Sequence, residues 1–119
     1  MSSFHLIWGY ASAAVSGVVG LWGVCMARRP GTPRVYWWAI GIAMASLIVQ
    51  IVTGVFMLSS GPDPGDQHVF YGVVIAVTMS FVYIYRSQFR KRPNLYYGLA
   101  LLFMMGLAVR GIMTLGINF

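Results

Sequence analysis

Two histidines are the residues of this chain whose type and spacing suggest chemistry. His5 is followed by two apolar residues, an aromatic residue and Gly9, and the same pattern recurs at His68–Gly72, 63 positions later. Two imidazoles that face each other across a helix bundle can bind a b-type haem, and small residues one turn away leave room for the flat porphyrin. Arg110 is a candidate partner for a haem propionate. His5, His68 and Arg110 are therefore candidate cofactor-binding residues for haem b.

Other features favour a protein without a cofactor. His5 falls in the first turn of its predicted helix, where an axial ligand would be poorly buried. A duplication alone explains why both histidines exist, and interfacial aromatic and His residues also serve as ordinary anchors. Two histidines are too few for a zinc site, which needs three or four protein ligands. We therefore expect no cofactor and no metal, and we keep haem b as the alternative.

The composition is that of a membrane protein. Of 119 residues, 59% are hydrophobic and only 8% are charged, and the mean hydropathy is +0.76. A soluble domain carries far more charge on its surface. The single cysteine excludes an internal disulfide. We expect one all-α integral membrane domain over residues 1–119, and we assign the net charge of +6 to loops rather than to nucleic-acid binding.

Four apolar segments are each close to the roughly 20 residues that a helix needs to cross a bilayer. They cover approximately residues 4–26, 35–58, 68–85 and 95–117. Because open strands cannot cross lipid, these segments are predicted to be helices. A basic turn at 27–34, a Gly/Pro/Asp loop and a second basic turn at 86–94 separate them.

The sequence predicts two tandem copies of one helical hairpin, over about 4–58 and about 67–117. Gln50 of the first copy aligns with Arg110 of the second. Both copies have the same topology, so the two parallel repeats are predicted to be related by a pseudo-twofold axis along the membrane normal. The predicted fold is an up-down bundle of four transmembrane helices with short loops.

The basic residues predict the orientation. Seven of the eight Lys and Arg residues lie in the turns 27–34 and 86–94. The positive-inside rule places these turns in the cytoplasm. Both termini and the loop that contains Asp63 and Asp66 are then outside, in a multi-pass protein of the bacterial cytoplasmic (inner) membrane.

Five residues are candidates for contact with partners or lipid. Gly9, Ser16 and Gly20 belong to a stripe of small residues that either packs inside the bundle or docks another protein. Gln50 and Arg110 are polar at membrane depth, which marks a structural pair or a contact with a cofactor, lipid or partner subunit. For Arg110 the candidate partners are Gln50, helix-end carbonyls, the loop aspartates and an acidic group outside the chain; snorkelling to the interface is the alternative.

The predicted spans contain no acidic residue. Proton- and cation-coupled transporters usually carry an intramembrane carboxylate, so the pattern argues against that class. No nucleophile–base arrangement and no phosphate-binding loop is identifiable in the sequence. We therefore expect a protein that is not an enzyme, and an oligomeric small transporter or channel is the weaker alternative.

Three motifs in the second half suggest a family. They are His68-x-Phe70-Tyr71-Gly72, Tyr83-x-Tyr85-Arg86-x-Gln88, and Tyr97-Gly98 followed by Phe103-x-Met105-Gly106-Leu107-x-x-Arg110. With them the chain resembles small uncharacterised bacterial four-span membrane proteins that accompany respiratory cytochrome complexes. The resemblance implies a non-catalytic accessory subunit of an electron-transport complex or supercomplex of the respiratory chain. Its partners would be membrane lipids and other integral membrane subunits.

Overall fold

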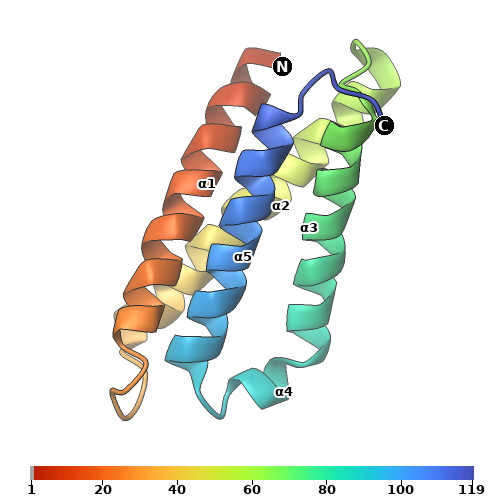
Figure 1. Ribbon diagram of the computed structural model, residues 1–119. Coiled ribbons are helices and arrows are strands. Elements are labelled where there is room, and N and C mark those ends of the chain that lie inside the picture. Colours follow the sequence, from red (N-terminus) through yellow and green to blue (C-terminus); the bar gives the residue numbers. More distant parts are fainter. Residues whose placement is uncertain (1) are drawn as a thin grey trace.

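The computed structural model describes residues 2–119 and contains only helices, turns and loops over that range (Figure 1). Met1, the first residue of the expected single domain, lies outside the described residues. The elements are α1 (Ser2–Cys25), α2 (Arg34–Ser60), α3 (Asp66–Ile84), the short α4 (Arg86–Phe89) and α5 (Pro93–Met113). All but α4 are long and apolar enough to cross a membrane. The prediction of an all-α chain with four candidate spans is confirmed.

The four long helices run alternately up and down (Figure 1). One end of the molecule holds the turn between α1 and α2 together with α4, and we call it the basic end. The other end holds the start of α1, the connection between α2 and α3 and the C-terminus, and we call it the histidine end. The chain's long axis extends 48 Å, against 23 Å and 20 Å across it.

The core lies where α5 packs between α1 and α3 and where α1 also packs against α2. Tyr36 is fully buried in this core, and its hydroxyl donates to the Val19 carbonyl at 2.8 Å, which satisfies the polar group. The buried apolar residues of α2 recur every three or four positions, which places them on one helix face. The core cluster consists of Val19, Tyr36, Ile40, Ala43, Leu47, Ile75, Leu101 and Met104.

Glycines bring α1 and α5 into close contact. A Cβ atom on Gly20 would lie 2.9 Å from the Gly98 carbonyl oxygen, and one on Gly98 would lie 2.8 Å from the Val24 nitrogen. Small residues at such a crossing let two backbones approach, which increases the dispersion contact between the helices. The α1–α5 pair is accordingly the most extensive helix contact in the molecule.

The α2–α3 pair is packed very differently, although the predicted pseudo-twofold axis makes it the counterpart of α1–α5. These two helices contact each other only sparsely. In the sequence alignment of the two hairpins, Gly20 corresponds to Tyr83 and Gly98 corresponds to Trp38. Bulky side chains therefore replace the glycines of the close crossing, and both are largely exposed, at 67% for Tyr83 and 70% for Trp38. The side of the bundle between α2 and α3 is left open.

The structure departs from the predicted segments by more than two residues at one helix end, and it contains one helix that was not predicted. The last helix ends at Met113 rather than near Ile117, because Gly116 adopts a positive φ of 84° and its N–H donates to the Pro64 carbonyl at 2.7 Å. The C-terminal tail thus folds back on the α2–α3 connection. The second basic turn contains the unpredicted helix α4, which places the Phe89 ring 5.0 Å from the Tyr97 ring and so covers an apolar side chain within a charged segment.

Candidate functional site

His5 of α1 and His68 of α3 meet across the histidine end of the bundle. Their ring centroids are 6.1 Å apart and their planes make an angle of 76°. Both residues are partly buried. The structure therefore brings together the two histidines that the repeated motif singled out, from residues far apart in the chain.

The His5 ring is held at both nitrogens by α2. Its Nδ1 lies 2.9 Å from the Thr53 hydroxyl oxygen. That hydroxyl donates to the Gln50 carbonyl at 3.0 Å, so it accepts the proton of His5 Nδ1. The amide nitrogen of Gln50 lies 3.3 Å from His5 Nε2 and donates to it. Gln50 thus closes a three-residue network, although its own buried Oε1 has no hydrogen-bond partner among the described residues.

His68 is held at one nitrogen by α5. Its Nδ1 lies 2.7 Å from the Gly111 carbonyl oxygen. Because a carbonyl can only accept, Nδ1 carries the proton, and the neutral ring has its lone pair on Nε2. A histidine whose Nδ1–H is fixed by a carbonyl has the arrangement typical of a metal ligand, since the bond fixes the tautomer and orients the ring.

Glycines make room for the His5 network. A Cβ atom on Gly9 would lie 2.9 Å from the Gln50 amide nitrogen, and one on Gly54 would lie 3.2 Å from Cε1 of His5. By contrast, a Cβ on Gly72, the counterpart of Gly9, would meet nothing within 4 Å. The space around the two histidines is therefore tight on the α1–α2 side and open beside α3.

Arg110 lies on the outside of this site and pairs with an aromatic residue that was not among its predicted partners. Its Nε and Nη2 atoms each lie 3.3 Å from the Tyr71 hydroxyl oxygen, to which they donate. The guanidinium carbon also lies 5.7 Å from the centroid of the Tyr71 ring, within the range of a cation–π contact. Arg110 is exposed, and Gln50, its counterpart in the first hairpin, binds His5 instead.

The small-residue candidates Gly9, Ser16 and Gly20 are all buried. Gly9 faces Gln50 of α2, and Gly20 faces the backbone of α5. Ser16 is fully enclosed, and its hydroxyl has no hydrogen-bond partner among residues 2–119. The structure therefore assigns these three residues to packing within the chain rather than to a docking surface, because α5 and α2 already cover this face of α1.

Two imidazoles, one from α1 and one from α3, lie together in this site with ring centres 6.1 Å apart. Nε2 of His5 is bonded to the Gln50 amide, so in this arrangement only His68 has an Nε2 without a hydrogen-bond partner among the described residues. Residues 2–119 contain no cluster of three or more His, Cys, Asp or Glu side chains, so the remaining positions on a metal would have to come from a non-protein ligand such as a porphyrin.

Two contacts of the site were not predicted from the sequence. They are the Thr53 hydroxyl on His5 and the Tyr71 hydroxyl on Arg110. Helical spacing could have indicated both residues as members of the site. Thr53 lies about one helical turn after Gln50, and Tyr71 lies about one turn after His68, so each shares a helix face with a candidate residue. No family model, no curated protein and no solved structure matches the chain. Its function is therefore inferred from the geometry and the sequence.

Proposed function

We propose that this chain is a multi-pass membrane protein that serves as a non-catalytic accessory subunit of a larger membrane complex. The open α2–α3 side carries this proposal. In the most apolar 18-residue window of each long helix, the buried share is 11% in α3 and 17% in α2, against 22% in α5 and 33% in α1. The helices of the two predicted hairpins pack to a similar extent, α1 on α2 and α3 on α5. Between the hairpins, however, α1 and α5 are in close contact, whereas α2 and α3 are not; we call the α2–α3 side the open seam. We infer that helices of another integral membrane subunit pack against the open seam.

The host that we propose is a respiratory electron-transfer complex of a bacterial cytoplasmic membrane. The support is the resemblance of the second half to proteins that accompany respiratory cytochromes, together with the small share of the chain that lies outside the four helices. In this proposal the basic end faces the cytoplasm and the histidine end faces outward, in accord with the positive-inside rule.

Affinity purification in mild detergent tests the accessory role. The tagged chain is expected to bring down cytochrome subunits, identified by mass spectrometry and by a reduced-minus-oxidised haem spectrum of the complex. Substitution of Ala for Trp38 and Tyr83, which are large exposed side chains of α2 and α3, should reduce this recovery more than substitution of Ala for Tyr10, an aromatic residue of similar exposure on α1. Recovery of the chain alone would contradict the proposal.

A second candidate function is that of a bis-histidine haem b cytochrome. The specific observation in its favour is the His5–His68 pair with each Nδ1 fixed by a hydrogen bond. His5 and His68 would hold the iron, and the group would supply one-electron transfer near the outer membrane surface. For His5 to bind, the Gln50 amide that now contacts its Nε2 would have to turn away.

The absorption spectrum of the purified chain decides between the two candidates. The cytochrome predicts a Soret band that His5→Ala and His68→Ala each abolish, while Phe70→Leu, a change at an exposed neighbour of His68, leaves it intact. A colourless preparation from cells with ample haem supply would exclude the cytochrome and leave the accessory role standing.

A further inference from the structure

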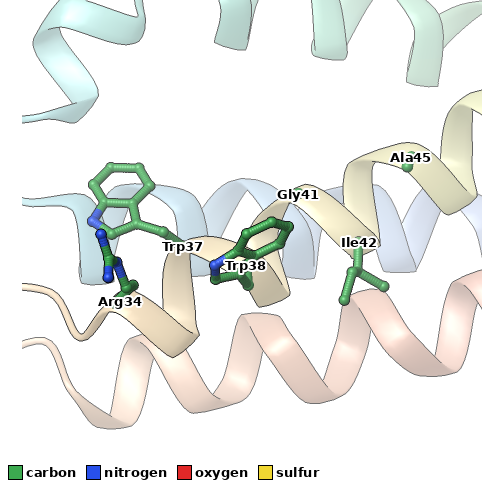
Figure 2. Close-up of a pocket in the computed structure, with 6 residues that line it drawn as sticks. All are labelled: Arg34, Trp37, Trp38, Gly41, Ile42 and Ala45. Atoms are coloured by element: carbon green, nitrogen blue, oxygen red, sulfur yellow. The ribbon is translucent and has the colours of Figure 1, made fainter.

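A groove runs along α2 at the basic end, and none of its lining residues belongs to the histidine site. It is a shallow, open groove with a volume of about 580 Å³, and all of its lining residues belong to α2: Arg34, Trp37, Trp38, Gly41, Ile42 and Ala45. Figure 2 shows Arg34 at the start of this stretch beside the two indole rings, with Gly41, Ile42 and Ala45 further along the helix. We propose that this groove binds one anionic phospholipid, with its phosphate on Arg34 and an acyl chain along the apolar floor. The inference rests on the proposed membrane insertion but not on the accessory role.

The charge distribution identifies the headgroup as anionic. The chain has only two acidic residues, Asp63 and Asp66, and both lie at the histidine end, as does the C-terminus (Figure 1). Arg34 begins α2 at the opposite end, next to the basic turn that contains Arg28 and Arg29. No carboxylate of this chain is therefore available there, and the counterion must come from outside. Anionic headgroups of a membrane leaflet supply that charge, because they attract basic segments at the membrane surface.

The shape and the lining identify the rest of the ligand. Beyond Arg34 the groove is almost wholly apolar, and Ile42 is 60% exposed although it lies two turns into the helix. Gly41 forms the middle of the floor, and a Cβ atom there would meet nothing within 4 Å. A cation at the helix start, indole rings one turn further along the helix and an open apolar surface beyond them match the order of a phospholipid's phosphate, glycerol region and acyl chain, since Trp favours the headgroup level.

Lipid titration of the delipidated chain in detergent tests this site, with native mass spectrometry counting bound lipid. The probes are dioleoyl phosphatidylglycerol, which is anionic, and dioleoyl phosphatidylcholine, which is not. The wild type is expected to retain one phosphatidylglycerol in preference to phosphatidylcholine. Arg34→Gln should reduce this preference about fivefold, the effect of one cation at an anionic surface. Gly41→Leu should lower the binding of both lipids, because the new side chain fills the groove without a clash.

Matched controls separate this site from general lipid association. Gly106→Leu adds the same side chain at another helical glycine with open space around it, and Arg28→Gln removes a cation that does not line the groove. Both controls should bind lipid as the wild type does. The proposal is overturned if either control lowers binding as much as its partner variant does, or if free inorganic phosphate displaces the bound lipid. If the affinity purification recovers no cytochrome subunits but the wild-type chain still retains phosphatidylglycerol, only the accessory role is contradicted.

Discussion

At the scale of single residues, the two histidines are not equivalent. Both nitrogens of His5 are occupied, Nδ1 by Thr53 and Nε2 by Gln50. His68 donates from Nδ1 to the Gly111 carbonyl and keeps the lone pair of Nε2 for a proton or a ligand. The two histidines occupy matching positions of the repeated sequence pattern, and their different neighbours on α2 and α5 give them different hydrogen bonds. His68 is therefore the residue at which we expect a bound group to engage first.

Thr53→Val tests the His5 network. The substitution keeps the shape of the side chain but removes the acceptor of the His5 Nδ1–H, so it should lower the free energy of unfolding in detergent by about 1 kcal/mol. Thr78→Val is the matched control, because the Thr78 hydroxyl bonds only a carbonyl of its own helix, at 2.8 Å. Equal losses in the two variants would show that the His5–Thr53 contact contributes nothing specific.

Arg110→Leu tests whether the exposed guanidinium contributes to assembly. The variant loses the Tyr71 contact, worth about 0.5–1 kcal/mol at an exposed site, and also a cation at the α5 surface. Recovery of partner subunits should fall more than in Arg90→Ala, which removes an exposed arginine from the basic end. Blue-native electrophoresis of membrane extracts measures the effect. If both variants assemble like the wild type, Arg110 merely snorkels to the interface.

At the scale of elements, the separation between helices follows from the size of a few side chains. The α1–α5 crossing is close because Gly20, Gly23 and Gly98 have no Cβ atom to keep the backbones apart. The aligned positions carry Tyr83 in α3, Arg86 at the start of α4 and Trp38 in α2. The bundle thus has a tight α1–α5 seam on one side and a loose α2–α3 seam on the other, and the loose seam is where we place the partner subunit.

Gly20→Ala tests the close seam. The new methyl group would lie 2.9 Å from backbone atoms of Gly98 and Leu102, so the helices must move apart, at a cost of about 1–3 kcal/mol. Gly106→Ala places the same methyl group in open space within α5 and should instead stabilise the chain by about 0.5–1 kcal/mol, because alanine favours the helix. Thermal unfolding of both variants in detergent is the measurement, and a stabilised Gly20→Ala variant would refute the tight crossing.

At the scale of the whole molecule, the chain is electrically polar along its long axis. Seven cations lie at the basic end, whereas the two carboxylates and the C-terminus lie at the histidine end. Arg110 is the single Lys or Arg residue in the histidine half. This separation favours the predicted orientation in a membrane and leaves the basic end without a carboxylate of this chain. The lipid proposal and the predicted topology therefore have the same physical origin.

Cysteine labelling tests the orientation. In a Cys25→Ser background, which removes the exposed native thiol, a cysteine at Ser60 should react with an impermeant maleimide applied to intact cells. A cysteine at Ser87 should react only after the membrane is opened. Both serines are exposed in the structure, so a difference in labelling reports the side of the membrane rather than burial. The reverse pattern would overturn the orientation.

Most of the fold could be predicted from local sequence, because apolar length, Gly/Pro-rich breaks and loop charge are read directly along the chain. The four helices and the location of the basic turns belong to this group. The end of α5 at Met113 and the helix α4 do not, since they depend on the tail bonding to Pro64 and on Phe89 packing against Tyr97. These contacts join segments that the local pattern treats separately.

The sequence by itself determined the candidate residues of the site, namely His5, His68, Gln50 and Arg110, through their rarity in apolar segments. Only the tertiary structure decided their partners: the amide of Gln50 reaches His5, whereas Arg110 turns to Tyr71. It also moved Gly9, Ser16 and Gly20 from a candidate docking face to the interior. The reason is that helix separations are set jointly by side chains on two helices, so neither periodicity nor composition of one helix fixes which neighbour it will meet.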